Sequence, residues 1–320
     1  MGNIMIFKNS IKILFSNFSN VWKMILYFLF VFAVSTGLLF LFVNPILKTI
    51  DNAGFFDRFV ELYSNFRTNL DLSVFFQDTA SLIDSLFQFI IDNATELWFW
   101  FLGIAIVVFF LNSFLLSLSN MAVCKSLHLY IGSMNKQGFF ASFADGFGKN
   151  IRFQLVRYLV SMPINILYAV LYLLSLRLFG ISWYVNILAV MLIIVGIILL
   201  FAFKTMIFSV WCPAYVVLNY GIFKSLRTAI KTVFKRFGRY FGAAVGVVLT
   251  IFVLNVFLGL FTFIVGFIVS IPISYMLYNV LGMVCLYEGQ GMRYYVDVYN
   301  VITPSKKETA DKLKDMKYLV

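Results

Sequence analysis

Two residues of the types that carry out nucleophilic catalysis, Cys124 and His128, lie one helical turn apart. A histidine at that spacing can remove the proton of a cysteine thiol and produce a nucleophilic thiolate. Such a pair needs a third group that orients the histidine, and the nearby sequence offers none. The other two cysteines, Cys212 and Cys285, have no histidine beside them, because the chain contains only one. We therefore expect a protein that is not an enzyme, with a Cys124/His128 site as the alternative.

The same residue types predict neither a metal site nor a cofactor. A structural zinc ion takes four cysteine or histidine ligands, often from Cys-x-x-Cys pairs, and this spacing does not occur in the chain. Three cysteines are an odd number, so they cannot all form disulfides within one chain. We expect reduced thiols that pack at crowded helix ends on the cytoplasmic side.

The composition indicates that a lipid bilayer surrounds most of the chain. Hydrophobic residues make up 62% of the 320 positions, and only 12% are charged, against about 25% in soluble domains. Phe alone occupies 39 positions, and a soluble fold of this size cannot bury so much apolar surface. Helices satisfy all their backbone polar groups inside lipid, so we predict an all-α polytopic membrane protein.

Six apolar runs approach the roughly 20 residues that a helix needs to cross a bilayer. We predict transmembrane helices at 24–43, 97–118, 158–176, 183–203, 240–261 and 263–286. The first run is too long for a signal-peptide core, so we expect it to be retained. The last two form one uncharged stretch between Arg239 and Glu288, which is long enough to cross twice.

Basic residues predict the orientation of these spans. If the N-terminus is cytoplasmic, most Lys and Arg residues fall on the cytoplasmic side. The outer side then holds only Lys48, Arg58, Arg67 and Arg177, apart from Lys204 near the end of the fourth span. This asymmetry follows the positive-inside rule, so both termini are predicted to lie in the cytoplasm.

One long connection, residues 44–96, lies on the outer side and holds more than half of the 14 acidic residues. Two of its segments have apolar residues at helical spacing, Phe56, Val60, Tyr63 and Phe66 in the first and Leu82, Leu86 and Ile90 in the second. We expect two amphipathic helices. They either cap the first two spans at the membrane surface or form a lid or docking site.

Three similar segments precede the odd-numbered spans, which indicates an internal repeat. They read "IFKNSIKILFSNFSNVWK", "GFFASFADGFGKNIRFQLVRY" and "GIFKSLRTAIKTVFKRFGRY". Each is basic and aromatic-rich, and a cysteine follows at the inner end of every even-numbered span. We predict three hairpins, each preceded by a cytoplasmic amphipathic helix, in units 1–118, 119–218 and 219–300. A charged cytoplasmic tail, 301–320, is expected to contain a short solvated helix.

The segment before the fifth span has the pattern of an interfacial helix. Basic residues occupy much of one side, and the predicted apolar face lies at the acyl boundary or against the spans. That face consists of Ile222, Leu226, Ile230, Val233 and Phe237, widened by Ala229, Phe234 and Phe241. The candidate lipid-headgroup ligands are Lys224, Arg227, Lys231, Lys235, Arg236 and Arg239. We expect anionic membrane lipids, or a protein partner, at this surface. Nucleic acid is not expected, because the positive-inside rule already accounts for basic segments beside spans.

Polar residues within the predicted spans form a second set of candidates: Asn112, Asn165, Asn186, Lys204, Asn255 and Asn279. No Asp or Glu lies in a predicted span, which argues against a proton-coupled transporter. Pro163 and Pro272 interrupt two spans, and broken helices line substrate sites in transporters. A permease or channel for a small or lipid-like solute is therefore the alternative function.

The stretch from Cys212-Pro213-Ala214 through Lys235 resembles a group of bacterial six-span membrane proteins. The group includes the membrane domain fused to some glycerophosphodiester phosphodiesterases and several uncharacterised families. The shared pattern is an apolar segment with a proline, a glycine, and a basic helix with alanine and serine. The resemblance implies a bacterial plasma membrane, but no catalytic residues, and the chain has no soluble phosphodiesterase domain. We expect a non-enzymatic protein that binds or organises lipid, or a protein partner, at the inner leaflet.

Overall fold

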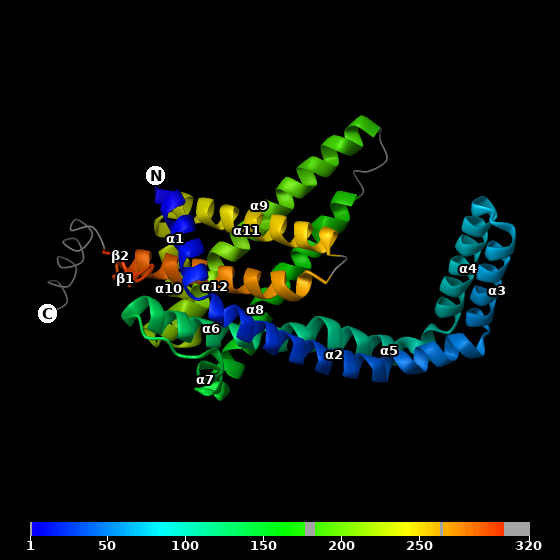
Figure 1. Cartoon of the computed structure of the whole chain (residues 1–320), viewed down its shortest axis with the longest axis horizontal. Helices are drawn as coiled ribbons and strands as arrows, with labels where there is room; N and C mark the ends of the chain where they lie inside the picture. Colours follow the sequence, from blue (N-terminus) through cyan, green and yellow to red (C-terminus); the bar gives the residue numbers. More distant parts are fainter. Residues whose placement is uncertain (1, 177–182, 263–264, 304–320) are drawn as a thin grey trace. The chain divides into compact units, whose positions relative to one another are not determined.

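The computed structural model describes residues 2–176, 183–262 and 265–303, and the side chains of residues 5–171, 191–262 and 265–303. Its long elements are all helices (Figure 1). Within these residues, seven helices are long and apolar enough to cross a membrane. The prediction of an all-α polytopic membrane protein is confirmed. The tail helix expected beyond residue 303 lies outside the described residues.

Six of the seven candidate spans overlap the predicted runs: Phe18–Asn52, Ala94–Ser133, Phe147–Leu171, Met191–Leu218, Phe237–Phe261 and Phe267–Gln290. The seventh, Leu72–Asp92, lies in the predicted outer connection and is among the least apolar of the set. Asp78 and Asp84 interrupt its apolar run, which is why the sequence did not indicate a span there. Length and composition thus give one candidate more than predicted.

The chain divides into two compact units. The bundle unit comprises residues 1–29 and 116–320, and the hairpin unit comprises residues 30–115. Helices α2 (Phe18–Asn52) and α6 (Ser113–Ser133) each have residues in both units. The bundle unit also holds α1 (Gly2–Ser16), α7 (Phe139–Ala144), α8 (Phe147–Leu176), α9 (Trp183–Leu218), α10 (Ile222–Lys235), α11 (Phe237–Phe261) and α12 (Phe267–Gln290).

Helix α12 is the most buried of the candidate spans. In its most apolar window 56% of the residues are buried, against at most 22% for any other span. It packs on α9, α11, α1 and α10, and Figure 1 shows it running beside α11. A Cβ at Gly282 would lie 2.0 Å from the backbone oxygen of Ser209 on α9. The glycine therefore permits the backbones of α9 and α12 to come into direct contact.

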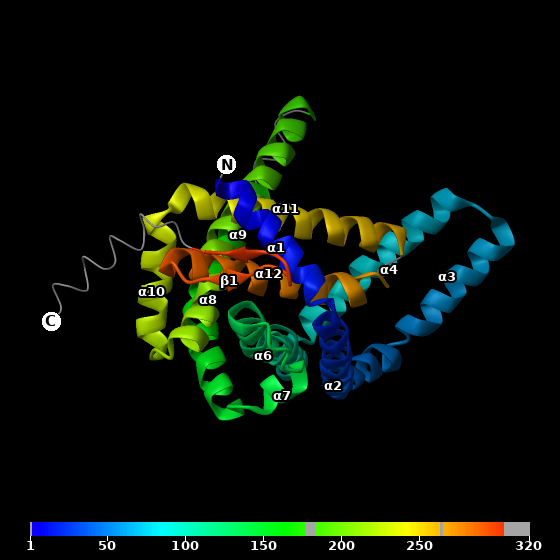
Figure 2. The same ribbon diagram turned by 60° about the vertical axis from the view of Figure 1, so that its left-hand side comes forward.

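The chain reverses directly after α12. Gly291 adopts the left-handed conformation with φ of 64°, and the Met292 N–H donates to the Tyr287 carbonyl at 2.8 Å. This geometry closes the helix, and glycine adopts it without strain. Two short strands follow, β1 (Tyr294–Tyr295) and β2 (Val301–Ile302), which pair antiparallel. The first residues of the predicted tail therefore belong to a hairpin that covers the end of α12 (Figure 2).

The three segments proposed as repeats form different local structures. Single non-helical residues, Asn17 and Arg236, separate α1 from α2 and α10 from α11. In the middle segment α7 is only six residues long, and a turn containing Gly146 at φ 73° separates it from α8. The rest of that basic segment is the first part of α8 itself. The middle segment thus shares composition with the other two but continues without a break into its span.

The hairpin unit contains the remainder of α2, α3 (Phe55–Asn69), α4 (Leu72–Asp92), α5 (Ala94–Ala105) and the π-helix η1 (Ile106–Asn112). Helices α3 and α4 pack on each other, with ring centroids 4.5 Å apart for Phe66 and Phe75. They correspond to the two amphipathic helices predicted in 44–96. Asp71 caps α4 by accepting from the backbone N–H groups of Ser73 and Val74.

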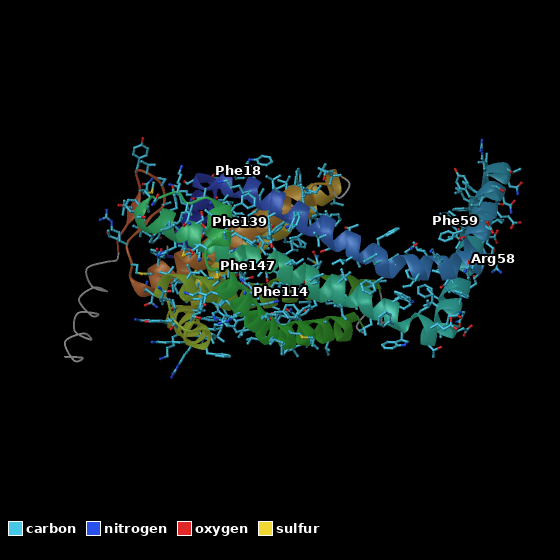
Figure 3. All side chains as sticks on the ribbon, turned by 90° about the horizontal axis from the view of Figure 1, so that it is seen from below. Phe18, Arg58, Phe59, Phe114, Phe139 and Phe147 are labelled. Carbon is cyan, nitrogen blue, oxygen red and sulfur yellow. The ribbon has the colours of Figure 1, made fainter. Side chains whose placement is uncertain are left out.

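The apolar faces of α3 and α4 do not all meet. Phe56, Val60 and Tyr63 of the predicted α3 face are exposed, whereas Leu82 and Leu86 on α4 are half-buried. Figure 3 shows Arg58 and Phe59 on α3. No residue of α4 is buried among the side chains that the structure describes. Much of the apolar surface of this unit therefore remains uncovered by the protein.

Candidate functional site

Helix α10, the basic segment, is fixed at its first turn by a buried tryptophan on α9. The indole Nε1–H of Trp211 donates to the Ile222 carbonyl at 3.0 Å and to Ser225 Oγ at 3.1 Å. Trp211 is fully buried, so the two acceptors satisfy its only polar group inside the bundle unit. The start of the basic helix is thereby held against the transmembrane helices.

Small residues, rather than the large apolar ones, form the buried face of α10. Its buried positions are Ser225, Ala229, Thr232 and Val233. Thr232 accepts from Gln290 Nε2 on α12 at 3.0 Å, and a Cβ at Gly289 would lie 2.2 Å from Thr232 Cγ2. Because this contact is so close, only small side chains fit between α10 and α12.

The protein buries only part of the predicted apolar face of α10. Val233 is buried, but Ile230 and Phe237 are 37% and 39% exposed. Phe223 and Phe234 are exposed still further, at 69% and 51%. The helix thus has three faces: a small-residue face against α9 and α12, an exposed apolar face and a basic face.

Four of the six candidate headgroup ligands lie on the basic face. Lys224, Arg227, Lys231 and Lys235 are exposed, and long nitrogen-tipped side chains extend outward from the yellow α10 in Figure 3. Lys224 Nζ lies 4.2 Å above the Tyr220 ring. Within the described part of the chain, Arg227, Lys231 and Lys235 form no ion pair with a carboxylate. Arg236, at the end of the helix, is half-buried.

The sixth candidate, Arg239, is engaged inside the protein. Its Nη2 lies 2.7 Å from Glu288 Oε2, and the Glu288 side chain is only 8% exposed. Tyr294 donates to the other carboxylate oxygen at 2.9 Å, and Asn9 Nδ2 on α1 donates to the Tyr294 hydroxyl at 2.9 Å. Burial, with the nearby Glu288 charge, raises the pKa of Tyr294, so its hydroxyl remains a donor.

Glu288 is a residue that the sequence reasoning did not single out. In the sequence, Glu288 marks only the end of the uncharged stretch that begins after Arg239. The ion pair shows that the two ends of this stretch meet, because α11 and α12 pack side by side. A basic and an acidic residue at the two ends of an apolar stretch long enough for two spans therefore predict an ion pair between them.

The intramembrane amides are distributed over separate helix contacts. Lys204 on α9 donates to Asn165 Oδ1 on α8, so two of the candidates bind each other. Asn279 on α12 donates to Asn120 Oδ1 on α6 at 2.9 Å. Asn255 on α11 accepts from Ser270 on α12 at 2.7 Å. These bonds join neighbouring helices instead of converging on one site.

Asn112 and Asn186 complete this set. In the hairpin unit, Asn112 Oδ1 at the end of η1 accepts from Ser35 Oγ on α2 at 3.3 Å. The side chain of Asn186 lies outside the described residues. Asn112 therefore joins two helices, as the amides of the bundle unit do.

Cys124 and His128 both contact α12. The Cys124 thiol donates to Asn279 Oδ1 at 3.4 Å, and His128 Nδ1 lies 2.6 Å from the Tyr287 hydroxyl. Cys124 is fully buried and neighbours Cys212. The tyrosine is a partner that orients the histidine, but the histidine bonds outward to α12 instead of to the thiol.

Comparison with protein-family models, curated proteins and solved structures finds no match. The chemistry of the site follows from its geometry alone. A fixed helix with exposed cations beside exposed phenylalanines can bind phosphate headgroups and insert rings between acyl chains.

Proposed function

We propose that this protein is a non-enzymatic membrane protein that binds and organises anionic lipid at the cytoplasmic leaflet through α10. The arrangement of α10 carries the proposal. Its small-residue face is fixed against α9 and α12, so its cations and its phenylalanines extend together toward the surroundings. Each cation close to an anionic leaflet contributes about 1 kcal/mol of binding free energy.

We further propose six transmembrane helices in three hairpins, with both termini in the cytoplasm of a bacterial cell. In this topology α3 and α4 lie at the outer surface, and α10 lies at the inner one. The Arg239–Glu288 ion pair supports two crossings by α11 and α12, because it brings their polar ends to the same side. If α4 also crossed, the basic residues of α10 would lie outside, against the positive-inside rule.

The topology can be tested with single added cysteines, because the three native cysteines are buried. Thr68→Cys on α3 and Lys235→Cys on α10 replace exposed residues. In intact cells, a membrane-impermeant maleimide should label Thr68→Cys, and should label Lys235→Cys only after permeabilisation. Labelling of Lys235→Cys in intact cells would show that α4 crosses the membrane.

The lipid-binding function can be tested by reversing three charges of the basic face, Arg227→Glu, Lys231→Glu and Lys235→Glu. The protein would be extracted in native nanodiscs, and its phosphatidylglycerol to phosphatidylethanolamine ratio compared with that of the bulk membrane. We expect the wild-type protein to be enriched in phosphatidylglycerol and the triple variant to lose most of this enrichment. The matched control, Arg67→Glu on α3, should retain it, and unchanged enrichment in the triple variant would refute the proposal.

The intramembrane polar residues do not favour the permease or channel alternative. Lys204, Asn165, Asn255 and Asn279 each bond a neighbouring helix in the bundle unit. Contacts of this kind hold helices together and leave fewer polar groups available to a solute.

A further inference from the structure

Arg157 lies within an apolar stretch of α8 that is long enough to cross a membrane. Its Nη2 donates to the Tyr278 hydroxyl on α12 at 2.8 Å, and its Nη1 donates to Gln154 Oε1 at 3.4 Å. A guanidinium has five N–H donors, so these two acceptors leave most of its capacity unused. In the sequence, Arg157 is one of the basic residues assigned to the cytoplasmic side, and it lies at the end of the second repeat segment.

No carboxylate neutralises Arg157 among the residues that the structure describes. The ionisable groups that face it are two phenols and two thiols, Tyr278, Tyr275, Cys212 and Cys124. Lys204 donates to Asn165, which lies eight residues beyond Arg157 and so about 12 Å farther along the axis of α8. A cation inside a bundle without a carboxylate counter-ion is costly, and such residues mark functional sites in membrane proteins.

Gln154 presents a third donor beside the guanidinium. Its side chain is 1% exposed, and its Nε2 has no hydrogen-bond partner. The amide orientation is determined by Arg157, because a guanidinium only donates and therefore needs the oxygen of Gln154. A buried N–H group without an acceptor destabilises the protein unless a ligand supplies one.

Part of the Arg157 side chain can be reached from the surface, because Arg157 is half-buried, whereas Gln154 beside it is buried. Exposed Lys149 precedes Arg157 by eight residues, which is about 12 Å along the helix axis. In the proposed topology this places Arg157 just inside the cytoplasmic leaflet, close to the depth of lipid phosphates.

We propose that Arg157 and Gln154 bind a phosphate group within the bundle unit. Arg binds phosphate with two parallel N–H donors, and an amide N–H adds a third. The phosphate belongs either to an anionic lipid headgroup or to free phosphate, since both present the same oxygens. The choice of lipid rests on the proposed function, but the site uses no residue of α10.

The test uses the full-length protein in a neutral, phosphate-free detergent solution. Inorganic phosphate, phosphatidylglycerol and zwitterionic phosphatidylcholine would be titrated separately. Native mass spectrometry would give the stoichiometry, and the shift in Tm would give the affinity. We expect saturable binding at one site by phosphatidylglycerol and not by phosphatidylcholine. Binding of inorganic phosphate as well would assign the site to phosphate from either source, and no saturable binding of either anion would refute the proposal.

Substitutions at Gln154 separate a binding role from a structural one. Gln154→Glu places a carboxylate beside Arg157 where the ligand phosphate would lie, so we expect a higher Tm without ligand and loss of anion binding. Gln154→Leu removes the unpaired donor, and we expect the affinity to fall about tenfold. Unchanged affinity in both variants would show that no anion binds between Gln154 and Arg157.

Arg157→Lys retains the charge but loses the paired donors, and we expect its affinity to fall at least tenfold. The α10 triple variant serves as the matched control and should retain the saturable site. Loss of lipid enrichment in that variant, with one-site binding intact, would support both proposals. If one-site binding is intact and the α10 triple variant keeps its lipid enrichment, the proposed function of α10 is refuted and the Arg157 site is not.

Discussion

The bundle unit and the hairpin unit contain similar residue types but use them differently. In the bundle unit, side chains such as Asn9, Asn279 and Glu288 are buried and bond across helices. In the hairpin unit, α4 buries no residue among the described side chains, and many phenylalanines of α3 and α4 are exposed. Specific polar contacts therefore determine the packing of the bundle unit, whereas the hairpin unit exposes much of its apolar surface.

The largest expected effect comes from breaking the ion pair of the bundle unit. Glu288→Ala leaves Arg239 and the Tyr294 hydroxyl without their buried acceptor, so we expect a loss of about 3 kcal/mol of stability. Unfolding by SDS titration in detergent micelles measures it. The matched control is Glu61→Ala on exposed α3, which should change the stability by less than about 0.5 kcal/mol. Equal losses in the two variants would contradict the difference drawn between the units.

Two glycines sharpen the comparison at helix contacts. Gly282→Ala pushes a methyl group against the Ser209 backbone of α9, which cannot move without shifting a helix, so we expect a loss of about 1–3 kcal/mol. In the hairpin unit a Cβ at Gly103 would meet the side chain of Phe42 at 2.1 Å. A ring can rotate away, so Gly103→Ala should cost less. The same unfolding assay measures the loss of stability in both variants. A larger loss for Gly103→Ala than for Gly282→Ala would contradict this prediction.

The smallest effect is expected at the turn between α3 and α4. Leu70 is exposed and adopts the left-handed conformation with φ of 52°, which strains a residue with a side chain. Leu70→Gly removes this strain and an exposed apolar side chain, but it gives the unfolded chain more freedom. We expect a gain below about 1 kcal/mol, measured by thermal unfolding followed by circular dichroism. A loss of more than 1 kcal/mol would mean that the Leu70 side chain stabilises the turn.

The sequence predicted the helical membrane class and most of the spans because apolar length is a local property. It indicated α4 as an amphipathic helix but not as a candidate span, because Asp78 and Asp84 lower its apolarity although its length suffices. It also could not tell which residues of α10 the protein buries. Periodicity groups Ile230 and Phe237 with Val233, but the close approach of Gly289 on α12 selects smaller residues for the buried face.

The polar contacts show a second limit of sequence reasoning. Asn165 and Lys204 were both identified as unusual, but their bond depends on the packing of α8 against α9. Arg157 reads only as a cytoplasmic basic residue, because nothing in its local sequence shows that the Tyr278 hydroxyl on α12 accepts its hydrogen bond. Sequence therefore identifies which polar residues enter the membrane, whereas their partners depend on tertiary structure.

The Arg239–Glu288 pair has a consequence for how the chain is made. During synthesis, Arg239 leaves the ribosome long before Glu288, with the whole of α11 and α12 between them. The guanidinium must therefore remain in water or at headgroups until both helices have entered the bilayer. Closure of this hairpin is consequently a late, post-insertion step, and it anchors α1 through Tyr294 and Asn9 only after residue 294 has been made. Helix α1, although made before α11 and α12, therefore acquires its contact through Asn9 late.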